Sequence, residues 1–538
     1  MKNVDVVVVG AGFSGLYLLY RLRKAGFSTR VFERGGGVGG TWYWNRYPGA
    51  RCDVESLQYS YSFDEQLQQD WHWPEKFSAQ PDILAYANYV ADRFDLKKDI
   101  EFNVEVKGSW FDENSNRWKI TTNTGEDINS QYFIMATGCI STTQIPNIKG
   151  LSDYVGNTFH TGDWPHKEVD FSGQSIAVIG TGSSGIQSIP VLAKQAKKLT
   201  VFQRTPNYSI PSQNEPMTKK YERSWKDVYS ERRKEMRYSA HGSLKDLNDV
   251  PALSVDKDQR QELYAKRWAI GGTGFLGSFN DLLTSADANY TAAEYVRQQI
   301  KKIVNDKETA EILCPRSYPI GTKRICIDTG YFETYNRENV KLVDISKKPI
   351  QRLVADGIIV DDQLYPFDSI IFATGFDAMT GSLFNVDIKG RDGLALKDKW
   401  NAGPKTYLGL MSASFPNLFM ITGPGSPSVK SNMIMSIEQH VDLVTETLLT
   451  MRSKGLSVVE PELEAENKWV DHVQEVANKT LFPQANSWYM GANIPGKPRL
   501  FMPYIGGVGA YRQICEEIVA NNYRGFKFEK SKQVIAAE

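Results

Sequence analysis

The sequence predicts an α/β protein with two Rossmann-like dinucleotide-binding domains and a helical insertion. Three observations support this fold class. A glycine turn, G-A-G-F-S-G at Gly10–Gly15, follows an apolar run at Val4–Val9, and a second, G-T-G-S-S-G at Gly180–Gly185, follows Ser175–Ile179. An apolar strand, three glycines at fixed offsets and a helix start together form a dinucleotide-binding turn. The third observation is the length of 538 residues, which exceeds what one hydrophobic core supports.

The amino-acid composition indicates which binding partners and which cell compartment to expect. Lysine plus arginine number 63, as do aspartate plus glutamate, so the net charge gives no reason to expect nucleic acid or an anionic membrane. The five cysteines show no C-x-x-C or C-x4-C spacing. This argues against a zinc site, a disulfide framework or a redox dithiol and fits a reducing cytosol. No apolar run approaches the ~18 residues of a membrane span, so we expect a cytoplasmic protein. From the cysteine spacing we expect no metal. The sequence does not indicate an oligomeric state.

The first turn has the features of an FAD site. Gly10 permits the tight turn, Gly12 lets the backbone approach a pyrophosphate, and Gly15 lets helix and strand pack closely. Glu33 ends the next predicted strand, Thr29–Glu33, at the place about 20 residues on where a carboxylate binds ribose hydroxyls. Because a carboxylate repels a 2′-phosphate, we expect this turn to hold the adenosine of FAD.

The second turn differs at the corresponding position. Arg204 follows the apolar run Leu199–Gln203 where the first unit has Glu33. A guanidinium there can clamp a 2′-phosphate, which favours NADPH over NADH; the alternative is an ordinary surface arginine. Two such turns in one chain imply two dinucleotides held face to face, and therefore a flavin that is reduced by a nicotinamide.

Two similar segments indicate how the domains are connected. Gln131–Gly138 and Ser369–Gly375 both read as strands that run into A-T-G turns, and we interpret them as the two seams of a nicotinamide domain inserted into a flavin domain. The predicted ranges are 1–145 and 370–538 for the FAD-binding domain, 146–208 and 322–369 for the NADP-binding domain, and 209–321 for the helical insertion.

The insertion and the C-terminal part show conventional patterns. Between Pro206 and Ile320 apolar residues follow helical spacing amid dense charge, and Thr291–Glu294 reads as a capping box; we expect this region only to line a substrate entrance. Phe415–Thr422 predicts an apolar strand, and one apolar helix face follows, formed by Ile437, Val441, Val444, Leu448 and Met451.

Several loops carry charged or aromatic residues whose role is open from pattern alone. Gly39–Ser56 reads as a tight loop rather than a helix or strand, and its Arg51 and Asp53 could be a solvated ion pair. The basic pair Lys323-Arg324 follows a Pro-Ile-Gly turn, and neighbouring cations in a loop are most often solvated. Trp488 lies in a further loop, where it could simply cover core.

Two longer motifs resemble one enzyme family. Gly156-x-x-x-His160-x-x-x-Trp164-Pro resembles the fingerprint of the Baeyer–Villiger monooxygenases, except that Tyr154 stands where the family has phenylalanine. The segment G-T-W-Y-W-N-R-Y-P-G-A-R-C-D that ends at Asp53 resembles the second signature of that family. N- and S-oxidising flavin monooxygenases are similar as far as the histidine but usually lack the Trp-Pro ending. With the two nucleotide turns, the resemblance covers nearly the whole chain.

The resemblance assigns roles to individual residues. It implies that Arg324 is the active-site arginine and that Asp53 pairs with it. It implies that Gly156, His160 and Trp164 form the fingerprint, with His160 as a hinge organiser that links NADP to domain rotation. Together with the glycine turns, it predicts FAD contacts at Gly10, Gly12, Ser14, Gly15, Glu33, Thr41, Trp42, Asp53, Tyr59 and Val106. The predicted NADP contacts are Arg51, Gly180, Thr181, Gly182, Ser183, Ser184, Gly185, Gln187, Arg204, Thr205, Lys323, Arg324 and Trp488. The predicted substrate pocket contains Val429, Lys430 and Met433.

The activity that the resemblance implies is NADPH- and O2-dependent oxidation of ketones to esters or lactones through a flavin C4a-peroxide. The small-molecule partners are then a ketone or thioether and O2, with sulfoxidation as a side activity. One alternative is an N- or S-oxidising flavin monooxygenase, which incubation with a ketone would distinguish by the absence of ester. Another is a non-catalytic flavoprotein that responds to NADP, which would oxidise NADPH slowly whether or not a ketone is present.

Overall fold

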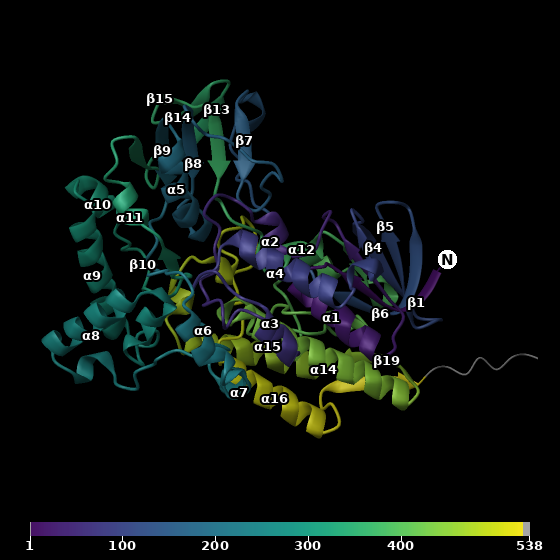
Figure 1. Cartoon of the computed structure of the whole chain (residues 1–538). Coiled ribbons are helices and arrows are strands. Elements are labelled where there is room, and N and C mark those ends of the chain that lie inside the picture. Colours follow the sequence, from purple (N-terminus) through teal and green to yellow (C-terminus); the bar gives the residue numbers. More distant parts are fainter. Residues whose placement is uncertain (1, 531–538) are drawn as a thin grey trace, which may run out of the picture.

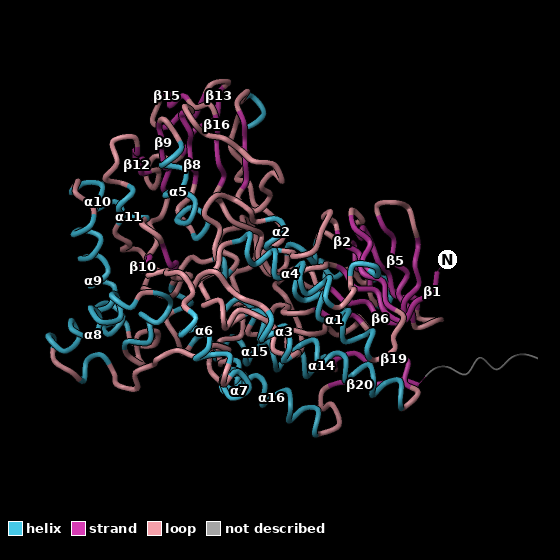
Figure 2. The backbone as a smooth tube through the Cα atoms, in the orientation of Figure 1, coloured by secondary structure: helices cyan, strands magenta, loops and turns pink. Residues whose placement is uncertain are grey.

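The structure, a computed structural model, describes residues 2–530, which form two β-sheet regions and a helical region (Figure 1). Figure 2 shows the strands gathered in two places, around β1 and β5 and around β8 and β9. Helices α8–α10 lie to one side of both. No helix among residues 2–530 combines the length and hydrophobicity that a membrane crossing needs.

The first sheet contains the N-terminal strand at its centre. Its order is β17-β4-β5-β6-β1-β2-β3, with β18 paired to β6. Val6, Val7 and Val8 of β1 are fully buried between the parallel neighbours β2 and β6, as expected for a strand covered on both faces. Helix α14 (Met433–Ser453) packs against α1 (Phe13–Lys24). The strands are β1 (Lys2–Val9), β2 (Thr29–Glu33), β3 (Ile100–Phe102), β4 (Val106–Asp112), β5 (Arg117–Thr122), β6 (Asp127–Met135), β17 (Asp387–Lys389) and β18 (Leu418–Met420).

The second sheet is parallel throughout. Its order is β12-β9-β8-β16-β7, and α5 (Ser183–Gln195) follows β8. Two Rossmann-like sheets are therefore present, as the sequence predicted. The boundary predicted between 369 and 370 falls inside β16; the other domain limits stay predictions. The strands are β7 (Asn157–His160), β8 (Ser175–Ile179), β9 (Lys198–Gln203), β12 (Val340–Asp344) and β16 (Ser369–Phe372), and the antiparallel strands β13 (Ile350–Val354), β14 (Gly357–Val360) and β15 (Gln363–Pro366) form a small third sheet.

The two A-T-G segments lie side by side. Gln144 N donates to Gly375 O at 2.9 Å, and Asp377 N donates to Thr142 O at 2.9 Å. The connection after β6 therefore runs antiparallel to the connection after β16, and both cross between the two sheets at the same place.

The insertion is helical, with one error in the predicted helix start. Thr291 does not cap a helix, because α9 (Ala286–Ile303) begins earlier, at Ser285, whose hydroxyl accepts from Ala288 N at 3.3 Å. The Thr291 hydroxyl donates instead to Ala288 O inside the helix. The other elements here are β10 (Ser209–Pro211), which pairs with β11 (Cys326–Asp328), and the helices α6 (Lys219–Lys226), α7 (Tyr229–Tyr238), α8 (Lys257–Ile270) and α10 (Lys307–Leu313).

Two further predictions need correction. Residues 39–56 are not loop throughout, because Thr41–Trp44 form one helical turn, α2, closed by Asn45 N donating to Thr41 O. The strand predicted over 415–422 is shorter, since Asn417 and Thr422 each have φ 57°, which breaks extended backbone on both sides of β18. The predicted apolar face of α14 is confirmed, with all five residues buried.

The remaining elements lie outside the two Rossmann-like sheets. They are α3 (Glu65–Asp70), α4 (Gln80–Arg93), α11 (Tyr331–Thr334), α12 (Gly381–Phe384), α13 (Leu396–Lys399), α15 (Leu463–Asn478), α16 (Val508–Ala520), β19 (Leu456–Pro461) and β20 (Phe526–Lys530).

Gly49 lies at a contact between the two sheet regions. Gly49 has φ +85°, and a Cβ there would lie 2.3 Å from the carbonyl oxygen of Gln187 and 3.0 Å from Val191 Cγ2, both on α5. The residue at 49 must therefore be glycine for both conformational and steric reasons.

We predict that Gly49→Ala lowers the free energy of unfolding by about 1–3 kcal/mol, as strained backbone positions typically do. Gly274→Ala is the control, since a Cβ added there would have no atom within 4 Å and the φ of this glycine is ordinary. Thermal unfolding followed by circular dichroism measures both variants. Equal melting temperatures would contradict the contact described between residue 49 and α5.

Candidate functional site

The first glycine turn leaves a helix N-terminus open to an anion. Gly10 has φ +104°, and a Cβ on Gly15 would lie 1.9 Å from Gly10 O, so both positions exclude a side chain. Helix α1 begins after Gly12 with no side-chain cap and no acidic residue in its first turn. Its free N–H groups and dipole favour a phosphate, which fits the FAD prediction.

Glu33 closes the turn from the end of β2. Its Oε2 accepts from Ala11 N at 2.8 Å, and its Oε1 accepts from Gly35 N at 2.7 Å. Burial raises the pKa of this carboxyl, against the effect of the two backbone donors. Each oxygen still has a lone pair for a ribose hydroxyl, so the group fits the predicted role.

The other predicted FAD residues come from neighbouring segments. Gly40 approaches Gly12 so closely that a Cβ on Gly12 would lie 3.3 Å from Gly40 Cα, and Thr41 follows directly in α2. Trp42 Nε1 donates to Tyr59 Oη at 3.2 Å. Val106 differs, because its side chain is buried in the core of the first sheet. Ser14 is buried in the first turn of α1.

The second turn repeats the geometry with more free space. Gly180 has φ +111°, and a Cβ there would lie 2.4 Å from Ala373 O. Nothing lies within 4 Å of a Cβ on Gly182, so this glycine leaves room that no protein atom fills. Helix α5 also starts without a side-chain cap, and the site fits a pyrophosphate.

The hydroxyl groups around this turn are engaged with the protein. Thr181 Oγ1 donates to Thr205 O at 3.0 Å, Thr161 Oγ1 donates to Ser184 Oγ at 3.0 Å, and Ser183 Oγ lies 3.1 Å from Cys326 Sγ. The last contact connects the turn to β11, the strand that follows Arg324.

Arg204 and Lys323 form a pair of cations beside the second turn. Lys323 Nζ lies 4.5 Å from the Tyr318 ring centroid. Burial and the positive charge of Arg204 lower the pKa of Lys323 to about 8. Neither side chain has a carboxylate partner within residues 2–530. Two neighbouring cations without a counterion favour the binding of an anion.

Arg324 and Asp53 form a close ion pair between distant segments. Arg324 Nε donates to Asp53 Oδ2 at 2.9 Å, and Nη2 donates to Oδ1 at 2.6 Å and Oδ2 at 2.7 Å. The negative charge of Asp53 raises the pKa of Arg324 above its usual value. Nη1 donates to Val429 O at 3.4 Å, and the guanidinium also interacts with the Tyr489 side chain; a bond of this length leaves Nη1 able to donate to a ligand.

Arg51 has a different partner from the one its position suggested. Its Nη1 donates to Glu75 and to Phe77 O, not to Asp53. The guanidinium therefore holds the 75–77 segment against the loop, and its predicted NADP contact stays a prediction.

Gln187 joins α5 to the loop around Gly49. Its Oε1 accepts from Tyr47 Oη at 2.7 Å and from Arg51 N at 3.3 Å, and its Nε2 donates to Arg51 O at 2.9 Å. Most of the amide's bonding capacity is thus used between the two sheet regions rather than toward a ligand.

The fingerprint residues surround the crossing between the sheets. His160 Nδ1 accepts from Gly162 N at 2.9 Å, and burial lowers the pKa of this ring, so it is neutral with its proton on Nε2. Nε2 lies 3.4 Å from Thr374 Oγ1 in the second A-T-G segment. Trp164 is buried, and its backbone N donates to Trp44 O in α2 at 3.4 Å.

Tyr154, which stands where the family fingerprint has phenylalanine, lies against Gly156. A Cβ on Gly156 would lie 2.3 Å from Tyr154 Oη, so only glycine fits beside this ring. The Tyr154 hydroxyl donates to Phe367 O at 3.0 Å. A tyrosine therefore replaces the family's phenylalanine without leaving a buried hydroxyl unpaired.

Comparison with known proteins decides the family. A Baeyer-Villiger monooxygenase from Pseudooceanicola batsensis is 39% identical over 526 residues, which cover 97% of this chain and 95% of that protein. The chain belongs to the Baeyer–Villiger monooxygenase family. The family described as pyridine nucleotide-disulphide oxidoreductase matches residues 4–234.

Solved structures of similar enzymes agree with this family and its cofactors. An oxidized steroid monooxygenase bound to NADP is 46% identical with a TM-score of 0.94, covering 98% of this chain and 100% of that one. An OTEMO complex with FAD and NADP is 38% identical with a TM-score of 0.94, covering 98% and 99%. This Baeyer–Villiger monooxygenase accordingly uses FAD and NADP(H), and both glycine turns fit their pyrophosphates.

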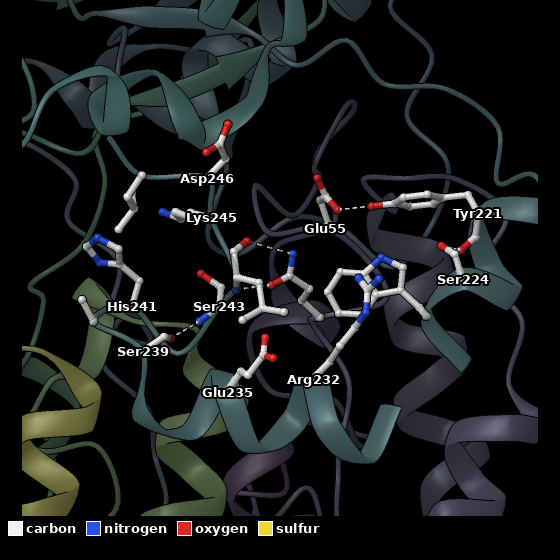
Figure 3. Close-up of a pocket in the computed structure, with 15 residues that line it drawn as sticks. Glu55, Tyr221, Ser224, Arg232, Glu235, Ser239, His241, Ser243, Lys245 and Asp246 are labelled. Carbon is white, nitrogen blue, oxygen red and sulfur yellow. Dashed lines mark hydrogen bonds between the residues drawn. The ribbon is translucent and has the colours of Figure 1, made fainter. Parts of the chain in front are cut away.

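Sequence reasoning missed three residues near Arg324. The electrostatic effect of Arg324 reaches Tyr489 and Lys245, and Lys245 in turn acts on His241. Figure 3 shows Lys245 and His241 on one side of a cavity of about 490 Å³. Tyr489 adjoins Trp488 and could have been suspected, but nothing in the local pattern of 241–245 indicates a site.

We predict that Gln187→Ala increases hydrogen exchange of the Arg51 amide by roughly 10- to 100-fold, because a hydrogen bond contributes about 1 kcal/mol and three are lost. Exchange measured by mass spectrometry or NMR reports this change. Gln363→Ala, at an exposed position of β15, is the control. Unchanged protection of residues 47–51 would show that Gln187 does not hold this loop.

Proposed function

We propose that Arg324, held by Asp53, is the catalytic charge-stabilising residue of the Baeyer–Villiger oxidation that this enzyme performs. The observation that supports it most is the geometry of the ion pair. Nε and Nη2 donate to Asp53, and Nη1 donates to Val429 O through a long bond of 3.4 Å. Bound FAD, once reduced by NADPH, supplies the activation of O2.

The guanidinium suits this role for two reasons. Arginine stays protonated near neutral pH, and Asp53 raises its pKa further. As oxygen is inserted next to the ketone carbonyl, negative charge develops on the carbonyl oxygen, and a fixed donor directed at it lowers the barrier. Asp53 does not contact substrate in this proposal; it orients the donor.

Arg204 and Lys323 are the proposed contacts of the 2′-phosphate of NADPH. Their mutual repulsion, with no carboxylate nearby, is relieved when a phosphate binds between them. The proposal includes the glycine turn 180–185 at the pyrophosphate, Trp488 at the nicotinamide nucleotide and His160 as the neutral hinge organiser beside the A-T-G crossing.

The substrate side is proposed to include Val429, Lys430 and Met433. Segments such as R-Y-P-G-A-R-C-D and G-P-G-S-P-S resemble phenylacetone monooxygenase within the family, which favours aryl-alkyl or linear ketones over small rings. Sulfoxidation of thioethers is proposed as a side activity. A panel of phenylacetone, cyclohexanone, long-chain ketones and thioethers, analysed for ester and sulfoxide, separates these classes.

We predict that Arg324→Ala still oxidises NADPH but forms almost no ester, because removal of one such donor typically costs ~3–4 kcal/mol, a 10²–10³-fold effect. Asp53→Ala should reduce ester formation less severely. Separate assays of NADPH loss and ester yield test both, with Arg316→Ala as control, since Arg316 is exposed and pairs with Glu311. Ester yield near the unmutated level in Arg324→Ala would overturn the assignment.

We predict that Arg204→Ala raises the KM for NADPH by roughly 10- to 100-fold, the value of a lost charge-assisted hydrogen bond, and raises the KM for NADH far less. Steady-state kinetics with both nucleotides measures this difference. Arg352→Ala removes an exposed arginine of β13 as the control. An unchanged preference between the two nucleotides would exclude Arg204 from the phosphate site.

A further inference from the structure

The segment that carries Trp488 continues as a loop, residues 491–498, whose backbone hydrogen bonds are local. Within the described range 2–530, every backbone hydrogen bond that this loop donates ends inside residues 487–498. Its hydrogen bonds to more distant parts of the described chain come from two side chains, those of Asn493 and Lys497. The position of the loop therefore depends on where these two side chains bind.

Both side chains bind the segment that follows the second A-T-G turn. Lys497 Nζ donates to Asp377 Oδ1 at 2.6 Å and to Ala378 O at 2.8 Å, and Asn493 Nδ2 donates to Phe376 O at 2.7 Å. The side chains of Lys497 and Asp377 are 10% and 25% exposed. Because a partly buried, charge-assisted bond is stronger than a solvated surface pair, this ion pair is the main polar anchor of the loop.

Residues 376–378 also contact the fingerprint segment. The ring of Phe376 meets the ring of His160 edge to face, with the centroids 6.2 Å apart. A Cβ on Gly162 would lie 2.4 Å from Phe376 Cε1, so the aromatic ring packs directly on the backbone that follows His160. One short segment therefore contacts both the fingerprint and the loop after Trp488.

Short-range bonds connect Trp488 to the anchored loop. The residues Trp488–Met490 form one helical turn, which Gly491 ends with φ +67°. Gly491 N donates back to Trp488 O, and Ala492 N donates to Ser487 O, both at 3.1 Å. The half-buried Trp488 side chain is thus fixed to the start of the loop, and the loop anchors limit where it can lie.

Apolar packing holds this loop only weakly. Ala492 packs against a hydrophobic cluster, but a side chain of this size buries little apolar area. Pro495 and Gly496 are exposed, and no atom lies within 4 Å of a Cβ added at Gly496. Segments with few buried apolar contacts open locally at low cost in free energy. The polar anchors on residues 376–378 therefore decide how firmly the loop is held.

We propose that Asp377 and Lys497 are positioning residues, whose ion pair transmits the position of the fingerprint segment to Trp488 and so sets Trp488 against the nicotinamide nucleotide. This rests on the proposed function, because it takes Trp488 as a contact of that nucleotide. Neither residue of the pair touches substrate or cofactor; both act through Trp488.

The test measures NADP+ affinity of the FAD-loaded, oxidised enzyme by titration, and amide exchange of residues 488–497 by mass spectrometry. Lys497→Met and Asp377→Asn should each weaken NADP+ binding and speed exchange by roughly 10- to 100-fold, the value of one charge-assisted bond. The double variant should be no worse than either single one, and Lys497→Arg should retain most of the affinity. Lys389→Met is the matched control and should change neither quantity, because it breaks an ion pair whose side chains are 47% and 64% exposed.

The decisive comparison repeats Lys497→Met in a Trp488→Ala background. If the pair acts through Trp488, Lys497→Met should have little further effect on NADP+ affinity once the indole is absent. A loss of the same size in both backgrounds would reveal a merely structural role and overturn the proposal.

Two further results separate the failure of the pair from the failure of the proposed function. Unchanged NADP+ affinity in Lys497→Met, with weakened binding in Trp488→Ala, defeats the positioning role alone. Unchanged affinity in Trp488→Ala defeats the proposed contact of Trp488 with the nucleotide, and the positioning role with it. If Lys497→Met does not fold, Asp377→Asn in the same two backgrounds decides.

Discussion

The ion pair of Arg324 with Asp53 is the constraint on which the site depends. The two residues belong to segments 271 positions apart, one next to α2 and the other next to β11. Only 14% of the Asp53 side chain is exposed, and a buried carboxylate without a partner is costly. The pairing therefore fixes where the 322–325 segment can lie relative to the first sheet, and it leaves one guanidinium nitrogen directed elsewhere.

Residues 39–56 connect the two sheet regions at several points. Gly49 meets α5, Tyr47 binds Gln187, Asp53 binds Arg324, and Trp44 accepts from the backbone of Trp164. These contacts are mainly hydrogen bonds and an ion pair, which can exchange with water more readily than a packed apolar interface. Residues 39–56 therefore contact both sheet regions. A rotation of one region against the other would change these contacts.

The sequence could reveal whatever depends on local backbone geometry. The glycine turns, the acidic end of β2 and the parallel strands were predictable because each requires particular residues at fixed spacing. The role of Asp53 was accessible only through family resemblance. The pairing of Arg51 with Glu75 depends on tertiary contacts. The capping box predicted at Thr291 was wrong because Ser285 caps the same helix six residues earlier. Local pattern could not rank these alternatives.

The lysines near Arg324 show the limit more sharply. Lys245 lies between two helices in a stretch without periodicity, and Lys430 was expected in the substrate pocket only through the family resemblance. Their nearness to Arg324 arises only on folding, since nothing in either local pattern links them to it. Charge balance there is a property of the folded molecule, because Asp53, which pairs with Arg324, comes from a segment 271 positions away.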